Sequence, residues 1–237
     1  MKAAVYGATR NVYEDIIPSL KSLLLNSDVD KVYILAEDND LNFYLPEECE
    51  VINVSKQEYF KRGCVNYFSH WSYMILLRTV YAELFPDLDR ILSLDNDTIV
   101  KEDISDLWDI NLDDYYFAAV KEPGKSTENF LYTCIGVSMF NLDFLRQDDK
   151  YKEIMLEVAN IRYEYPEQDV FNKLCQGHIL ELSPEYGMSP WTTQCEDPKI
   201  EHFAASNKKW REYEIVNYYR NISFQHTIDK MRKEYNR

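Results

Sequence analysis

The sequence predicts an α/β fold in which a mostly parallel central sheet is flanked by helices. An apolar segment at 3–8 is followed by an amphipathic helical segment at about 13–25 and by a second apolar segment at 31–36. Strands that alternate with helices pair in parallel, with connections of the usual hand. A further buried strand at 90–94 ends in Asp95-Asn96-Asp97, which puts polar side chains where open α/β sheets bind ligands.

The remaining elements follow from apolar periodicity. A short strand is expected at 51–54, and a helix from 69 to 85. Beyond residue 100 we expect a short helix at 103–108, strands at 117–120 and 136–140, a helix at 153–161, a helix that opens at Pro166, and strands at 179–182 and 200–204.

Composition restricts the class of protein. The chain has 237 residues, of which 46% are hydrophobic and 28% charged, as in a globular protein with a real core. No repeat or low-complexity linker interrupts it, so we expect one domain over residues 1–237, with a helical C-terminal tail from about residue 212. The formal net charge of −15 argues against a nucleic-acid backbone or an anionic membrane surface as the main partner.

The cysteines and the apolar runs predict the setting of the protein. Five cysteines, at positions 49, 64, 134, 175 and 195, show no C-x-x-C spacing, which disfavours zinc and disulfide frameworks. The N-terminus does not resemble a signal peptide, and no apolar run approaches the roughly 20 residues that span a bilayer. We therefore expect a cytoplasmic protein without a transmembrane segment, for which a peripheral place at the inner membrane face stays open. Its oligomeric state does not follow from the sequence.

The expected helix at 69–85 carries one charge on an apolar face. Its stripe is Trp71, Met74, Ile75, Arg78, Ala82 and Phe85. A charge on such a face is costly unless it is paired or hydrogen-bonded. Arg78 therefore forms either a salt bridge to a nearby acid or an anion site for phosphate or acceptor.

The Asp95-Asn96-Asp97 turn allows two interpretations. Two carboxylates separated by one residue suit Mg²⁺ or Mn²⁺ carrying a phosphate. Asn and Asp also favour ordinary surface turns. Two further polar segments could join this turn in one site: Glu167-Gln168-Asp169, at the start of a helix, and the loop from His202 to Trp210. An imidazole is a plausible third ligand beside two carboxylates, although a single histidine is more often structural.

Several motifs in order resemble the glycosyltransferase family 8 enzymes, which include glycogenin and bacterial lipopolysaccharide galactosyl- and glucosyltransferases. The resemblance runs from about residue 3 to residue 210. Residues 92–100 resemble the family's D-x-D strand, and residues 136–141 resemble the end of its N-A-G-V-x-x-F-N segment. Gln168-Asp169 matches the end of its D-Q-D motif. His202-Phe203, together with Lys208 and Trp210, resembles its H-F-x-G-x-x-K-P-W motif.

The resemblance implies a GT-A (Rossmann-like) fold, a nucleotide-sugar donor and transfer with retention of anomeric configuration. It implies Mn²⁺ (or Mg²⁺) held by Asp95, Asp97 and His202. It also implies that Gly7, Ala8, Thr9 and Asn11 surround the nucleoside and that Asn96 belongs to the D-x-D motif. Arg78 would lie at the donor sugar or its phosphates, and Lys208 at the diphosphate. Gln168 would lie near the reacting anomeric carbon, and the candidate catalytic residues are Gln168, Asp169 and Arg78.

This chain departs from the family pattern at four places. Cys134-Ile135 replace Asn-Ala, which affects the expected sugar and acceptor contacts. Glu167 replaces the first Asp of D-Q-D. Ala205 and Lys209 replace Gly and Pro in the last motif. Thr9-Arg10 replace an acidic pair that commonly holds uracil and ribose, so specificity for the base is less secure than metal binding.

The predicted function is Mn²⁺-dependent, retaining transfer of a hexose, from UDP-glucose or UDP-galactose, to a glycan, lipid-linked or protein acceptor. One alternative is a haloacid-dehalogenase-type phosphatase with Asp95 as nucleophile. That class requires Thr two residues after the second Asp, where this chain has Ile99. Its motif also normally ends the first strand of the chain, whereas here the motif comes after residue 90. The other alternative is a non-catalytic nucleotide-sugar-binding protein.

Overall fold

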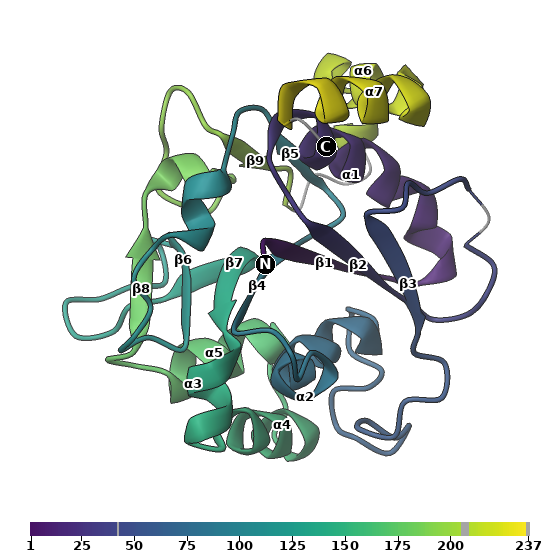
Figure 1. The fold of residues 1–237 in the computed structure, drawn as a ribbon. Coiled ribbons are helices and arrows are strands. Elements are labelled where there is room, and N and C mark those ends of the chain that lie inside the picture. Colours follow the sequence, from purple (N-terminus) through teal and green to yellow (C-terminus); the bar gives the residue numbers. More distant parts are fainter. Residues whose placement is uncertain (42, 205–208, 236–237) are drawn as a thin grey trace.

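The computed structural model describes residues 1–41, 43–204 and 209–235 of the chain. A seven-stranded sheet forms its centre, in the order β3-β2-β1-β4-β7-β6-β8 (Figure 1). Neighbouring strands are parallel except where β7 pairs antiparallel with β4 and β6. The predicted mostly parallel sheet is thus confirmed. Its strands are β1 (Ala3–Ala8), β2 (Lys31–Ala36), β3 (Cys49–Asn53), β4 (Arg90–Leu94), β6 (Phe117–Lys121), β7 (Thr133–Asn141) and β8 (Ile179–Leu182).

Helices cover both faces of the sheet, and Figure 1 shows α1, α6 and α7 above it and α2 to α5 below. The helices are α1 (Tyr13–Asn26), α2 (Tyr81–Leu84), α3 (Leu142–Gln147), α4 (Lys150–Asn160), α5 (Pro166–Leu174), α6 (Glu214–Asn221) and α7 (Phe224–Tyr235). The side chains of β1 alternate between the two faces of the sheet, so each face has its own hydrophobic core. Ala3 and Val5 belong to the core beneath the sheet, and Ala4 and Tyr6 to the core against α1.

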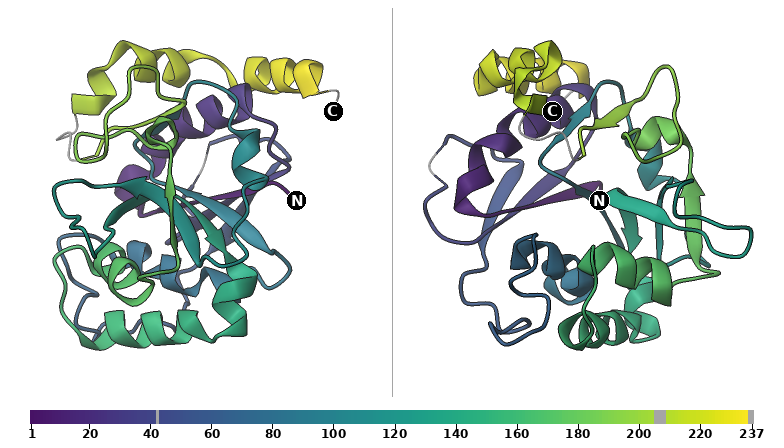
Figure 2. Two further views of the ribbon diagram at one scale, coloured as in Figure 1. Left: turned by 90° about the vertical axis from the view of Figure 1, so that its left-hand side faces the viewer. Right: turned by 180° about the vertical axis from the view of Figure 1, so that it is seen from behind.

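A small second sheet positions the site. Strand β5 (Thr98–Val100) pairs antiparallel with β9 (Ile200–His202). This pair packs on α1 and α6 through a separate cluster that includes Leu25, Ile99 and Val216. Figure 2 shows β5 and β9 near the C-terminal helices, on one side of the main sheet. The ends of strands β4, β5, β7 and β9 therefore meet in one region.

The predicted helix at 69–85 is wrong in its extent and geometry. A 3₁₀ helix occupies Tyr73–Val80, and α2 follows with four residues. Ser72 caps this segment, since its side chain accepts a hydrogen bond from the Met74 amide at 3.3 Å. Trp71 consequently lies outside the helix and is 39% exposed. The apolar stripe assumed 3.6 residues per turn, whereas a 3₁₀ helix has three.

Helices α6 and α7 lie in the C-terminal tail and pack on α1. The Lys21 ammonium donates to the carbonyl oxygens of Arg220 and Ile222, at 3.1 and 2.5 Å. The assignment of residues 1–237 to one domain stays a prediction. In the described part of the chain, no helix has the length and apolar character needed to cross a membrane.

Candidate active site

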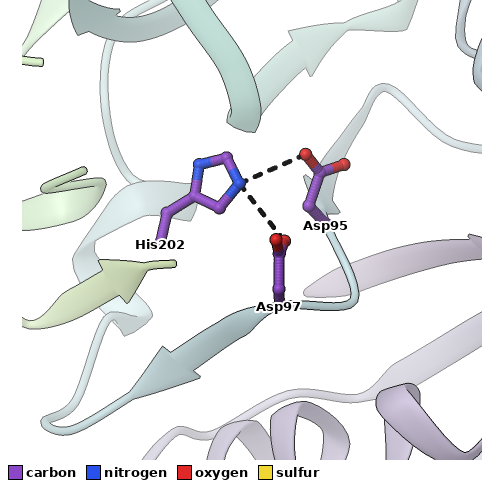
Figure 3. Close-up of side chains that lie close together, drawn as sticks. All are labelled: Asp95, Asp97 and His202. Carbon is purple, nitrogen blue, oxygen red and sulfur yellow. Dashed lines mark ion pairs between the residues drawn. The ribbon is translucent and has the colours of Figure 1, made fainter. Parts of the chain in front are cut away.

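Three side chains from two elements converge beside the end of β4. Asp95 and Asp97 lie in the turn from β4 to β5, and His202 ends β9. Because Thr98 pairs with His202 in the small sheet, the imidazole is placed next to this turn. Its Nε2 lies 3.3 Å from Asp95 Oδ2 and 3.3 Å from Asp97 Oδ1 (Figure 3). One ligand atom from each residue lies within 4.8 Å of the others. We call this trio the metal end of the site.

Strand β7 closes the metal end from the side, and Gly136 makes this close approach possible. The Asp95 amide donates to the Gly136 carbonyl at 2.7 Å. A Cβ at position 136 would lie 2.2 Å from His202 Cε1 and 2.7 Å from Asp95 Oδ2. Real atoms do not approach so closely, so the trio requires glycine here.

Arg78 joins the metal end to helix α5. Its guanidinium forms an ion pair with Asp95, donates to Glu167 Oε1 at 3.1 Å, and donates through Nε to Ser93 Oγ at 3.1 Å. Arg78 and Glu167 are both buried. Burial alone would raise the pKa of Asp95, but the Arg78 charge and the hydrogen bond from His202 hold it below its usual range. Burial raises the pKa of Glu167 to about 7, although the Arg78 charge opposes this rise.

His202 is held on both sides of its ring. Burial would lower its pKa, but the charge of Asp97 and hydrogen bonds with Asp95 and Asp97 raise the pKa well above the ordinary value. Its Nδ1 lies 3.8 Å from Cys134 Sγ. Two carboxylates and one imidazole are a donor set that fits Mn²⁺, and less closely Mg²⁺. Without a cation, the two carboxylates stabilise a proton on the imidazole. A bound cation would take the place of this proton.

The candidate catalytic residues of α5 point in different directions. Gln168 accepts a hydrogen bond from the Ile135 amide at 3.2 Å, and its amide nitrogen donates to Glu122 Oε1 at 3.0 Å. Its neighbour Asp169 instead accepts from the Tyr132 hydroxyl and, at 2.9 Å, from the amide of Tyr165. Consecutive side chains of a helix diverge by about 100°, so only one of the two can face the metal end.

A pocket of about 440 Å³ connects these groups. Its lining includes the metal end, together with Arg78, Glu167 and Gln168, but not Asp169. Sequence analysis missed several further lining residues, among them Trp71, Glu122, Lys125, Tyr165 and Trp191. They come from loops or helix borders where no motif marks them. The exposed position of Trp71 does not follow from a helical pattern, because the helix begins only at Tyr73.

The residues expected around the nucleoside lie at the carboxyl end of β1, outside this pocket lining. We call Gly7, Ala8, Thr9 and Asn11 the nucleoside end. Asn96 links the two ends, since its side-chain amide donates to the Gly7 carbonyl at 3.1 Å. Thr9 Oγ1 donates to Asn11 Oδ1 at 2.5 Å. Lys208, expected at the diphosphate, lies outside the described residues.

Comparison with known proteins decides the family. The sequence profile of "Glycosyl transferase family 8" matches residues 6–214. The chain belongs to glycosyl transferase family 8. It is 27% identical to the lipopolysaccharide 1,2-glucosyltransferase of Escherichia coli over 91% of this chain and 75% of that protein. It is 25% identical to glycosyltransferase GlyA of Streptococcus pneumoniae over 92% of this chain and 33% of that protein.

A solved structure shows the same fold. Galactosyltransferase LgtC, crystallised with donor and acceptor sugar analogues, aligns with a TM-score of 0.72 at 16% identity, over 96% of this chain and 99% of LgtC. This structural match confirms the predicted GT-A fold, and the profile match confirms the predicted family. The chain spans about half or less of the length of several curated relatives that it matches.

Proposed function

We propose that this family 8 chain transfers a hexose from a nucleotide sugar, UDP-glucose or UDP-galactose, to an acceptor hydroxyl with retention of anomeric configuration. The observation that carries the proposal is the metal end in one pocket with Arg78 and Gln168. The name of the E. coli relative, a glucosyltransferase, supports a hexose donor. The acceptor is a glycan, a lipid-linked precursor or a protein, and a cytoplasmic setting accords with five unpaired cysteines.

In this proposal Asp95, Asp97 and His202 hold Mn²⁺. When bound, the ion neutralises charge on the departing diphosphate. Arg78 fixes the carboxylate of Asp95 in a single orientation and adds a positive charge at the same end of the pocket. Preorganised charges of this kind favour a transition state in which negative charge builds up on the leaving group.

The contacts of α5 favour a reaction in which the acceptor attacks the same face of the donor sugar from which the diphosphate departs. A double displacement needs a free nucleophile, but Glu167 is paired with Arg78, and Asp169 is held by Tyr132 and the Tyr165 amide. Gln168 is a poor nucleophile, and its carbonyl dipole can stabilise a cationic sugar. The anomeric carbon would then lose the diphosphate oxygen and gain the acceptor oxygen, whose proton passes to the departing phosphate.

The phosphatase alternative is not favoured. A phosphatase nucleophile must attack a phosphoester, but the Asp95 carboxylate is already engaged by Arg78 and His202. The family match points to sugar transfer instead. A purely binding function would retain nucleotide affinity without turnover, which the following experiment separates from catalysis.

The experiment compares the unmodified protein with Asp97→Asn. Both are incubated with UDP-glucose, UDP-galactose and GDP-sugars in Mn²⁺, without acceptor, and donor hydrolysis is followed by NMR. We expect slow hydrolysis of a UDP-hexose to the retained anomer, and a loss of at least about 100-fold in the variant, because a lost ligand misplaces the diphosphate. Mn²⁺ affinity, measured by calorimetry, should fall in parallel.

Asp113→Asn is the matched control, since Asp113 is exposed and does not line the pocket. It should retain both hydrolysis and Mn²⁺ binding. Binding of UDP with Mn²⁺ but no hydrolysis of any donor would favour the binding protein. Hydrolysis that persists in EDTA would contradict the metal assignment.

A further inference from the structure

The tryptophans divide into two buried and two exposed residues. The chain has four in total, and Trp108 and Trp210 are 7% and 5% exposed. Trp71 and Trp191 are 39% and 57% exposed, and both line the pocket that contains the metal end. Indole side chains are highly buried on average, so large aromatic surfaces left open around a pocket indicate a binding surface.

The two indoles reach the pocket from opposite layers of the fold. Trp71 belongs to the segment before α2, and Trp191 to the connection between β8 and β9. These two segments lie below and above the central sheet in Figure 1. Tyr165 extends the lower aromatic wall, with its ring centroid 6.3 Å from that of Trp71 and the ring planes 35° apart.

Both aromatic walls are supported by polar contacts. The Lys125 ammonium lies 3.8 Å from the centroid of the Tyr165 ring. On the other side, Trp191 lies in a tight turn, where the Ser189 amide donates to Thr192 Oγ1 at 2.7 Å. The Thr193 amide ties this turn to β6 by donating to the Lys121 carbonyl at 3.0 Å. An aromatic side chain that projects from a backbone held in this way loses less entropy when it binds a ligand.

Hydrogen-bonding groups complete the pocket between these walls. Glu122 is buried and accepts from Gln168 at 3.0 Å, and its other oxygen lies 3.7 Å from the Lys125 ammonium. Burial raises the pKa of Glu122, against the opposing charge of Lys125. The pocket therefore combines flat aromatic faces with donors and acceptors, and it lies next to the end where the donor phosphates are expected.

We propose that Trp71 and Trp191 hold a pyranose ring of the acceptor, which makes the acceptor a glycan. A pyranose carries C–H groups on its ring faces and hydroxyls at its edge, so it can cover an indole while bonding to the polar groups. An alkyl chain would displace water from these polar groups without offering them a hydrogen bond. A serine or threonine side chain is too small to cover aromatic surfaces on both sides. This inference rests on the proposed function, because it names the acceptor of that reaction.

The test measures acceptor and donor separately in Trp71→Ala, Trp191→Ala and Trp71→Phe. The acceptor panel contains the methyl glycosides of glucose and galactose, lactose, maltose, and the N-acetyl amides of serine, threonine and tyrosine. We expect a pyranoside to be used, with its KM raised about tenfold or more by either alanine variant. Trp71→Phe should recover most of this loss, and donor hydrolysis without acceptor, measured in all three variants, should fall much less than use of the acceptor does.

Phe68→Ala is the matched control. Phe68 is 71% exposed, only a few residues from Trp71, and does not line the pocket. It should leave the acceptor KM unchanged. Any loss that Phe68→Ala shares with Trp71→Ala would mean that general surface hydrophobicity, and not the pocket, binds the acceptor, and would overturn the inference.

Binding is measured independently of turnover by saturation-transfer NMR of the same glycosides with UDP and Mn²⁺. We expect contact signals from the ring protons in the unmodified protein and their loss in Trp71→Ala. If no pyranoside binds, or if only the amino-acid amides bind in a Trp71-dependent way, the glycan acceptor is wrong. Absence of donor hydrolysis in the unmodified protein would instead count against the proposed function, since pyranoside binding can still be observed without it.

Discussion

The metal end and the nucleoside end of the candidate site differ in how far their side chains are fixed. At the metal end His202 is buried and contacts both carboxylates, and Arg78 holds Asp95 from the other side. Asp95, His202 and Arg78 each have more than one partner within the protein. The trio therefore needs little rearrangement to accept a cation.

The nucleoside end, taken together with the neighbouring Arg10, is more open: Ala8 is buried, but Arg10 and Asn11 are exposed, and the polar groups here satisfy one another. Thr9 bonds to Asn11, and between them Arg10 forms ion pairs with Asp38, at 2.9 Å, and with Asp40. The Arg10 side chain is 63% exposed. A base that binds here would compete with these contacts and with water.

This contrast suggests that the two ends of the site have different roles, one in the chemical step and the other in donor binding. Buried charges at fixed positions favour the chemical step, because they need no reorganisation as charge develops. Exposed ion pairs contribute little individually and are screened by salt. Changes at the metal end should therefore lower kcat, whereas changes at the nucleoside end should alter donor binding slightly. Three predictions test this difference, beginning with the largest effect.

The largest effect is expected from Gly136→Ala. The added methyl group would lie 2.2 Å from His202 Cε1, so the imidazole must move away from the carboxylates. Displacement of about 1 Å in a preorganised site costs on the order of 100-fold in rate. We expect a loss of that size in kcat and a corresponding loss of Mn²⁺ affinity, measured by calorimetry, while the circular dichroism spectrum stays unchanged.

Gly124→Ala is the control for this change. Gly124 lines the same pocket, but a Cβ there would meet no atom within 4 Å. It should keep Mn²⁺ affinity and kcat close to those of the unmodified protein. Normal metal binding by Gly136→Ala would show that the metal end is less rigid than its contacts indicate.

The same contrast explains which parts of the site could be predicted from sequence. Asp95, Asp97 and His202 lie in recognisable motifs, and the end of a buried strand is where a parallel sheet binds ligands. Arg78 stands out in the sequence because a charge interrupts an apolar pattern, but the sequence alone leaves both of its possible roles open. Its pairing with Asp95 depends on how the 3₁₀ helix packs beside β4, and its pairing with Glu167 on how α5 docks below the sheet. Local sequence encodes neither.

The aromatic walls of the pocket could not be predicted, for a related reason. Trp71 fits a helical stripe only if the segment has 3.6 residues per turn, and the 3₁₀ geometry of Tyr73–Val80 removes it from that stripe. Trp191 lies in a connection without a regular pattern. Local periodicity therefore gave most strands and helices within a few residues, while the side chains contributed by loops required the tertiary structure.

A smaller effect, on stability, should follow from Glu167→Gln. Burial raises the pKa of Glu167 from 4.5 to about 7 in the folded protein. The folded state therefore binds more protons than the unfolded state between these values, and its stability falls as the pH rises through this window. Glutamine can still accept from Arg78 but does not titrate.

This prediction is measured by urea unfolding of both proteins at about pH 5 and pH 8. The stability of the unmodified protein relative to Glu167→Gln should fall by up to about 3 kcal/mol across this range. Asp169→Asn provides a comparison on the same helix. A difference that stays constant with pH would mean that Arg78 keeps Glu167 ionised throughout, and the metal end would then be even more strongly fixed than we argue.

The smallest effect is expected from Arg10→Ala at the nucleoside end. Because Arg10 is exposed and its partners remain hydrated without it, melting temperature and kcat should be unchanged within error. The donor KM should change by less than about threefold, and this change should diminish in high salt, as expected for a screened charge. Lys152→Ala, which removes another exposed, ion-paired cation, on α4 and outside the pocket lining, separates a local effect from that of net charge. If Arg10→Ala lowered kcat as strongly as Gly136→Ala, the nucleoside end would contribute to the chemical step, and its exposed ion pairs would have to become buried around the donor.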